Sequence, residues 1–272
     1  MMNTAHAFVR NRTPLCWSFF IRGAPGLQYY GLDNAYRHTA ALEKDMSTAA
    51  QHRSSASGTT GRVVHWAAQY DVVVWLYTLG RERRFREKLI GLARLRPGDV
   101  VLDVGCGTGT LAIAAKRHVG PSGLVHGIDA SEEMIDRAKR KAGKARVDVA
   151  LRNAVVEALP YPDAQFDVVM STLMLHHLPR KARQECAREI RRVLKPGGRL
   201  LAVDFAAPAR GKKSLFGHFH RHGHVDQSDI VELLAGAGLR VVESGAVGVR
   251  NLHFTLATAP PRVASAPLAV EG

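Results

Sequence analysis

The chain has 272 residues, of which 46% are hydrophobic, and its formal net charge is +14 at pH 7. This length and composition favour one large α/β core, and no apolar run reaches the roughly 18 residues of a membrane span. The three cysteines, Cys16, Cys106 and Cys186, have no paired spacing, which argues against a disulfide framework and favours a reducing, cytoplasmic compartment.

The first 61 residues differ in composition from the rest of the chain. Residues 51–62 are rich in Ser, Thr, Gly and Arg and lack apolar periodicity, which is typical of a linker. The apolar run 15–21 is short and lies between two arginines, so a targeting segment is only the alternative interpretation. We predict a weakly ordered extension over residues 1–61, a folded domain over 62–259 and a flexible tail over 260–272.

Two helices are predicted next, over residues 64–79 and 81–95. The first carries four aromatic side chains, Trp66, Tyr70, Trp75 and Tyr77. An aromatic stripe at helical spacing is more typical of core packing than of ligand contact.

A short buried strand over residues 100–104 stops abruptly in a glycine-rich turn. Its apolar residues follow the pattern of a parallel strand covered on both faces, and Asp103 is the exception. A carboxylate inside such a strand is unfavourable unless something satisfies it. Three glycines follow at alternate positions, where they let the backbone turn tightly and approach a ligand closely: Gly105, Gly107 and Gly109. With a helix over residues 110–118, this unit predicts a ligand beyond the end of the strand.

A second strand over residues 123–128 is followed by another acid, Asp129. Ser131 is expected to cap a basic amphipathic helix that continues to about Lys141, because acidic residues follow it in the first turn. An acid about 20 residues beyond a glycine loop can accept hydrogen bonds from two ribose hydroxyls. The sequence therefore predicts Asp129 as a ribose ligand.

The spacing of the glycines distinguishes between nucleotide-binding families. The run G-x-G-x-G differs from the G-x-G-x-x-G of dinucleotide-binding proteins, and the G-K-[ST] of a P-loop is absent. Residues 103–109 instead resemble the D-x-G-x-G-x-G motif of the class I methyltransferases that use S-adenosylmethionine. Residues 157–169 and 189–198 resemble later motifs of the small-molecule subfamily that includes quinone and phospholipid methyltransferases. In the second of these, Lys-Pro-Gly-Gly at 195–198 is expected to end a helix and form a turn.

The resemblance implies a doubly wound, Rossmann-like α/β fold with helices on both faces of the sheet. Seven strands are expected, mostly parallel, with an antiparallel last strand at about 250–258. It also implies S-adenosylmethionine as the cofactor. The residues implied to contact it are Tyr70, Asp103, Gly105, Cys106, Gly107, Gly109, Asp129, Ala130, Met134, Val155, Val156 and Ser171.

One position departs from the family pattern. Many relatives have an Asp that contacts the adenine amino group, and Val155 stands there when the chain is aligned without a gap. Adenine recognition would then depend on backbone groups and on apolar packing by Val155 and Val156, or on Asn153 if the loop bulges. Cys106, within the glycine loop, is interpreted as a small residue that fits there rather than as a nucleophile.

The segment after the fourth strand bears on the acceptor. Methyltransferases of base amino groups usually carry Asn-Pro-Pro-Tyr or Asp-Pro-Pro-Tyr there, whereas residues 171–175 are Ser-Thr-Leu-Met-Leu. This favours a partly apolar acceptor such as a quinone, a lipid or a hydrophobic metabolite. His176 and His177 follow, close to where the methyl group should point, and His176 is predicted as a general base, with a packing role as the alternative.

The remaining charged residues and histidines are less informative. Much of the positive charge lies on helical faces, which favours solvated surfaces, and peripheral contact with an anionic membrane is the second interpretation. Four alternating histidines in the loop after the fifth strand lack a familiar ligand spacing, so no metal site is predicted: His218, His220, His222 and His224. Their loop is interpreted as a border of the acceptor site or as a plain exposed loop. We predict a metal-independent methyltransferase of a small molecule. A non-catalytic cofactor-binding protein and a nucleic-acid methyltransferase are the alternatives.

Overall fold

The computed structural model describes residues 80–205, 227–249 and 251–261. The predicted extension, the helix predicted over 64–79 with Tyr70, and the four alternating histidines from His218 to His224 lie outside these residues.

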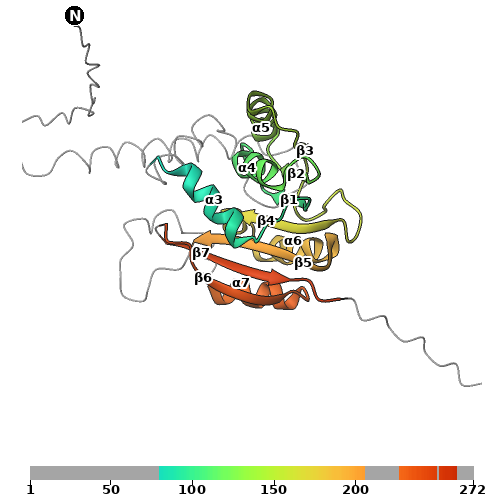
Figure 1. Ribbon diagram of the computed structural model, residues 1–272. Helices are drawn as coiled ribbons and strands as arrows, with labels where there is room; N and C mark the ends of the chain where they lie inside the picture. Colours follow the sequence, from blue (N-terminus) through green and yellow to red (C-terminus); the bar gives the residue numbers. More distant parts are fainter. Residues whose placement is uncertain (1–79, 206–226, 250, 262–272) are drawn as a thin grey trace, which may run out of the picture. The chain divides into compact units, whose positions relative to one another are not determined.

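Seven strands form one sheet in the order β3-β2-β1-β4-β5-β7-β6 (Figure 1). The strands are β1 (Val100–Val104), β2 (Leu124–Asp129), β3 (Ala150–Asn153), β4 (Phe166–Thr172), β5 (Leu194–Phe205), β6 (Arg240–Ala246) and β7 (Leu252–Thr258). β7 runs antiparallel to both of its neighbours, β5 and β6, whereas the other four pairs are parallel. The predicted doubly wound sheet with an antiparallel last strand is confirmed, and that strand begins at Leu252.

Helices cover both faces of the sheet. Neighbouring residues of each strand point to opposite sides, so the apolar strands present an apolar surface on each face. Val101 and Val168 contribute to a core with α3 (Glu82–Leu92) and α4 (Thr110–Val119). Leu102 and Val169 contribute to a second core with α6 (Arg180–Val193) and α7 (Gln227–Gly236). Helix α5 (Glu132–Ala145) lies alongside α4 (Figure 1). Both faces of the central strands are therefore buried, as their apolar runs predict.

The helix predicted over residues 81–95 ends earlier, at Leu92, and two further predicted boundaries also change in the structure. The cap of α5 is confirmed, since Ser131 Oγ accepts a hydrogen bond from the Met134 N–H at 3.3 Å, but the helix continues past Lys141 to Ala145. The buried Ala142 extends its apolar stripe by a further turn, and this extension explains the longer helix. The Lys-Pro-Gly-Gly run is not a separate turn. Helix α6 ends at Val193 and β5 begins at once, with a register shift that the run occupies.

The order of the strands determines where a ligand can bind. The chain moves outward from β1 to β3, then returns to place β4 on the other side of β1. In open α/β sheets, ligands bind at such a reversal, beyond the carboxyl ends of the two central strands. The tips of β1 and β4 therefore mark the expected site.

A loop rather than a helix connects β3 to β4, over residues 154–165, and Arg192 of α6 holds it. Its guanidinium donates to the carbonyl oxygens of Leu159 and Tyr161 at 3.0 and 2.7 Å. It also binds the carboxylates of Glu189 and Asp163. Glu189 in turn accepts a hydrogen bond from the Leu159 N–H at 2.8 Å. This network gives a physical reason for the motif at residues 157–169, because it fixes the loop that carries Val155 and Val156.

Replacing Arg192 with methionine is expected to lower the free energy of unfolding by about 2 kcal/mol. Several charge-assisted hydrogen bonds are lost, but the side chain is 30% exposed, so water replaces part of them. Urea denaturation would measure the change. Arg188→Met on the same helix is the matched control, because Arg188 is exposed. An equal loss in both variants would show that apolar packing alone holds the loop.

Candidate active site

Asp129 joins the glycine loop to the tip of β2. Its Oδ2 accepts a hydrogen bond from the Gly107 N–H and its Oδ1 accepts one from the Ser131 N–H, both at 2.9 Å. Burial raises the pKa of Asp129, and the two backbone N–H groups partly oppose that effect. The carboxylate oxygens have further lone pairs, so Asp129 can hold the loop and still accept hydrogen bonds from a ligand.

The other side of the glycine loop is held by Lys141. Its ammonium group donates to the hydroxyls of Thr108 and Thr110 at 3.0 and 2.7 Å. Gly105 has a left-handed φ of +70°, and a Cβ there would collide with the Met174 side chain. The loop therefore turns where the sequence predicts it, between β1 and the start of α4.

Asp103 is the most unusual group at this edge of the sheet. It is 2% exposed, and in the described part of the chain its Oδ2 has no hydrogen-bond partner. Arg86 of α3 has a buried Nε that is likewise unpaired among these residues. Burial raises the pKa of Asp103 to about 7, against the effects of the Arg86 charge and of the Ala112 N–H, while the Asp129 charge raises it further. A buried acceptor at Asp103 and a buried donor atom at Arg86, whose charge acts on Asp103, are thus both unpaired among these residues, while the Nη2 of Arg86 donates to Glu82 at 3.3 Å.

The residues predicted to surround adenine lie around the tip of β2. Val156 is buried and Val155 is half-buried. The Asn153 side-chain amide donates to the Asp129 backbone oxygen at 2.9 Å, so this donor is already used within the protein. Met134, 2% exposed, and Ala130 flank the N-terminus of α5. The structure therefore brings these predicted residues to one strand tip, with apolar side chains predominating.

Cys106 lies within the loop as a buried thiol. Burial raises its pKa well above the ordinary value, and the charges of Asp103 and Asp129 raise it further. A thiol in that state is a poor nucleophile, because the thiolate is the reactive form. These properties support the interpretation of Cys106 as a small residue that fits the loop.

The tip of β4 leads to a second group of polar side chains. Ser171 is 1% exposed, and its Oγ has no hydrogen-bond partner among the described residues. After it, η1 (Leu175–His177) carries His176, whose Nδ1 lies 2.7 Å from Asp204 Oδ1 at the end of β5. Asp204 was absent from the sequence prediction. The signal was present, since Asp204 follows the apolar run 200–203 as Asp129 follows the second strand.

Comparison with known proteins agrees with this geometry. Residues 101–198 match a family model described as a methyltransferase domain. The chain contains an S-adenosylmethionine-dependent methyltransferase domain. The family and the cofactor that its motifs predict are thereby confirmed.

The domain resembles both characterised relatives and solved structures. It is 44% identical over 124 residues to 27-O-demethylrifamycin SV methyltransferase from Amycolatopsis mediterranei, covering 45% of this chain and 44% of that protein. It is 38% identical over 144 residues to a ubiquinone/menaquinone biosynthesis C-methyltransferase from Bordetella avium, covering 53% and 56%. A SAM dependent methyltransferase from Aquifex aeolicus has a TM-score of 0.60 at 25% identity, covering 71% of this chain and 96% of that one. The chain spans about half the length of the two curated relatives.

The residues of the domain fit S-adenosylmethionine. Its amino-acid end has an ammonium group and a carboxylate, which complement the unpaired Asp103 Oδ2 and Arg86 Nε. Its ribose has two adjacent hydroxyls, which complement a carboxylate at the tip of β2. When bound, its positive sulfonium supplies an electrophilic methyl group. Arg86 is a second residue that the sequence prediction missed.

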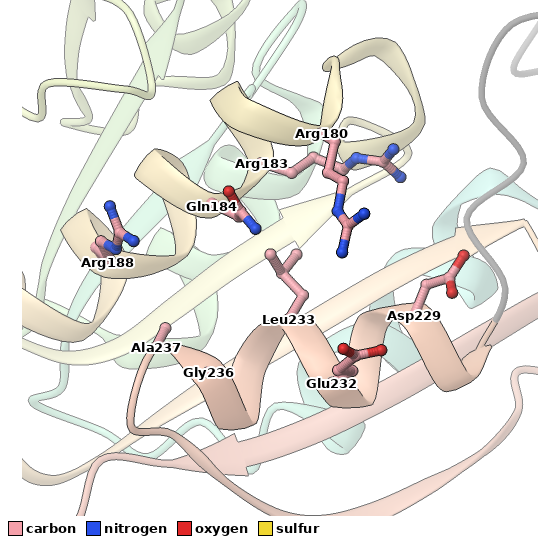
Figure 2. Close-up of a pocket in the computed structure, with 9 residues that line it drawn as sticks. All are labelled: Arg180, Arg183, Gln184, Arg188, Asp229, Glu232, Leu233, Gly236 and Ala237. Carbon is pink, nitrogen blue, oxygen red and sulfur yellow. The ribbon is translucent and has the colours of Figure 1, made fainter.

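A separate groove runs between α6 and α7 (Figure 2). Basic residues of α6 and acidic residues of α7 line it, and the side chain of Arg180 extends toward α7 while that of Arg188 points away. The lining residues are Arg180, Arg183, Gln184, Arg188, Asp229, Glu232, Leu233, Gly236 and Ala237. None of these belongs to the predicted site.

Residues 80–205, 227–249 and 251–261 contain neither a metal-ligand cluster nor a membrane-spanning helix. No group of three or more His, Cys, Asp or Glu side chains in these ranges could hold a metal ion. No helix there combines the length and the apolar character needed to cross a membrane.

Proposed function

We propose that this chain transfers a methyl group from S-adenosylmethionine to a small, partly apolar acceptor. The observation that carries the proposal is the pair of unpaired buried groups, Asp103 Oδ2 and Arg86 Nε, beside the point where the strand order reverses. An unpaired buried acceptor or donor lowers stability, so its retention calls for a ligand that satisfies it. A zwitterionic amino acid satisfies both atoms at once.

Each end of the cofactor has its own set of residues in this proposal. Asp103 accepts hydrogen bonds from the ammonium group, and Arg86 binds the carboxylate. Asp129 accepts hydrogen bonds from the ribose hydroxyls, while Val155 and Val156 pack against adenine. The glycine loop, through Gly105, Gly107 and Gly109, lets the backbone approach the ligand closely. The task of the protein is then to align the two reactants and exclude water, which in well-oriented systems lowers the barrier by up to about 7–11 kcal/mol.

Two acceptor classes follow from the names of the relatives. One name specifies an oxygen of a rifamycin derivative and the other specifies a carbon in quinone biosynthesis. Both are consistent with the apolar residues Leu173, Met174 and Leu175 at the tip of β4. We place the reaction in the cytoplasm, where the basic surface would allow peripheral contact with an anionic membrane.

The first experiment measures cofactor binding and the fate of the methyl group. Saturating S-adenosylhomocysteine should raise the melting temperature, because it binds only the folded state. A protein whose melting responds to NAD but not to S-adenosylhomocysteine would contradict the proposal. Methyl-labelled S-adenosylmethionine, incubated with cell extract, should then transfer label to the organic phase. Binding without transfer would indicate a non-catalytic protein, and label in RNA would indicate a nucleic-acid methyltransferase.

The pKa of Asp103 predicts a pH dependence of stability without ligand. Burial raises that pKa from 3.8 to about 7, so the folded protein binds this proton more tightly than the unfolded chain. The resulting stabilisation is fully present below about pH 4 and is lost as the pH rises through 7. Relative to the Asp103→Asn variant, the free energy of unfolding should fall by about 1.4 kcal/mol per pH unit between pH 4 and 7.

Urea denaturation of both proteins at each pH gives this difference and cancels the other titrating groups. The difference should level off above pH 7, where Asp103 is ionised in both states. A constant difference across the range would show that Asp103 titrates normally in the folded protein.

A further inference from the structure

His176 and Asp204 form a closed hydrogen-bonded pair at the tips of β4 and β5. Asp204 is 1% exposed, and its Oδ1 lies 2.7 Å from His176 Nδ1. Its Oδ2 accepts a hydrogen bond from the His176 backbone N–H at 3.1 Å, and its Oδ1 accepts another from the Phe205 N–H at 2.8 Å. The carboxylate thus holds both the backbone and the ring of the same histidine.

This arrangement determines the tautomer of the ring. An ionised carboxylate only accepts hydrogen bonds, so the proton of a neutral imidazole lies on Nδ1. Nε2 then has the free lone pair, and none of the described residues makes a hydrogen bond to it. The ring is held further by the edge of Phe205, with centroids 5.1 Å apart, and by His177, at 3.9 Å. Its side chain is 19% exposed. A basic nitrogen is therefore held in a fixed orientation on a partly exposed ring.

We propose that the acceptor is a hydroxyl compound and that His176 Nε2 takes the hydroxyl proton, with Asp204 as the positioning residue. The inference rests on the proposed methyl transfer. The O–H bond of the acceptor breaks as an N–H bond forms at Nε2. The new oxygen–methyl bond forms as the methyl–sulfur bond of the sulfonium donor breaks, which leaves an ether and a neutral thioether. Asp204 stays ionised and stabilises the imidazolium, which later releases its proton to water.

A hydroxyl group fits a single oriented base better than the other acceptors do. A neutral amine attacks with a lone pair that it already has, so it needs no base beforehand. A ring carbon activated by a hydroxyl must lose its own proton after the methyl group arrives, in addition to the hydroxyl proton. A hydroxyl oxygen loses one proton as its bond to the methyl group forms, and the pair supplies one basic atom for it.

The test uses 2-methyl-1,4-dihydroxynaphthalene, which offers hydroxyl oxygens and a free ring carbon in one apolar frame. It is incubated without oxygen with the full chain and ¹³C-methyl S-adenosylmethionine, and NMR locates the label. The label is expected on oxygen. His176→Gln should lower kcat by about 10²–10⁴-fold, while calorimetry shows unchanged affinity for S-adenosylhomocysteine.

Asp204→Asn tests the positioning role. An amide can donate to Nδ1 and so favours the tautomer with its proton on Nε2. We expect a large loss of kcat, and ¹⁵N NMR of the ring should show the proton moved from Nδ1 in the original chain to Nε2 in the variant. His118→Gln is the control, because this histidine of α4 bonds the Leu95 backbone oxygen and should leave kcat unchanged.

In the original chain, kcat should fall at acidic pH as the ring protonates, and His176→Gln should lose this limb. His177 beside the ring and His253 opposite Asp204 in β7 are the other titratable groups to replace in turn.

Several results would overturn the proposal. In the labelling experiment, these are label on the ring carbon, or no label from a protein that binds S-adenosylhomocysteine. In the kinetics, they are full turnover by His176→Gln, or loss of the acid limb of the kcat profile when His177 or His253 is replaced instead. In the NMR experiment, it is a proton on Nε2 of His176 in the original chain. Failure of the original chain to bind S-adenosylhomocysteine would instead contradict the proposed function itself.

Discussion

Replacing Asp129 with alanine is expected to weaken the affinity for S-adenosylhomocysteine by at least about 100-fold. The variant loses a carboxylate that is proposed to accept two hydrogen bonds from ribose, and each hydrogen bond to a charged group contributes about 1.5–3 kcal/mol. It also loses the acceptor for the N–H groups of Gly107 and Ser131, so the loop is less well held. Isothermal titration calorimetry of the two proteins measures the effect.

Two further variants separate ribose binding from loop anchoring. Ser131→Ala removes the cap of α5, at about 1 kcal/mol of stability, but leaves the Asp129 carboxylate in place. Asp129→Asn keeps one acceptor oxygen without the charge and should bind with intermediate affinity. If Ser131→Ala weakened binding as much as Asp129→Ala, the effect would come from the start of the helix and not from contact with ribose.

The acids of the candidate site that the sequence predicts share one local pattern, a carboxylate within or directly after a short apolar run. Asp103 and Asp129 each interrupt or follow a short apolar run, and the glycines stand directly between them in the chain. A strand that is buried on both faces restricts where a carboxylate can lie, so the acid at its end can be identified from neighbouring residues alone. The N-cap at Ser131 is local for the same reason, and its partner is three residues away.

The missed residues depend on contacts between distant segments. Asp204 has the signature of a strand-end acid, but its role depends on His176, which is 28 residues earlier and comes near it through the parallel pairing of β4 with β5. Arg86 lies on α3 and influences Asp103 across the packing of that helix against the sheet. Helical periodicity identifies the buried face of α3 but does not specify which polar group that face meets. The roles of Asp204 and Arg86 therefore depend on contacts between distant segments, which the local sequence pattern does not specify.

The Lys-Pro-Gly-Gly run shows how a correct local signal can lead to a wrong element. Helix α6 does end just before the run, at Val193, with an extended Leu194 as its C-cap. Residues of the run nevertheless bond to the residue that follows β7, because the Gly197 N–H donates to the Ala259 backbone oxygen at 2.7 Å and the Ala259 N–H donates to the Gly198 backbone oxygen at 2.9 Å. The partner strand is 60 residues away in the chain, so the extension of β5 through this run could not be predicted from the run itself.

Replacing Gly109 with alanine is expected to lower the free energy of unfolding by about 2–4 kcal/mol. Gly109 is the N-cap of α4 and has a left-handed φ of +75°, which a side chain adopts at a cost of about 1 kcal/mol. A Cβ there would lie 2.8 Å from Ala138 Cβ and 3.4 Å from Ala138 Cα. Both atoms belong to the rigid part of α5, so relief requires a shift of the helix, and overpacking of this kind costs about 1–3 kcal/mol.

Gly238→Ala is the matched control for the cost of placing a side chain on a residue with a left-handed φ. Gly238 follows α7 with a φ of +78°, and nothing lies within 4 Å of the position that its Cβ would take. This variant should lose only about 1 kcal/mol, so the difference between the two variants in urea denaturation isolates the contact with α5. Equal losses would mean that α4 and α5 move apart without strain. A larger loss at Gly109 would show that close packing of these helices, as well as freedom of the backbone, requires glycine at the end of the loop.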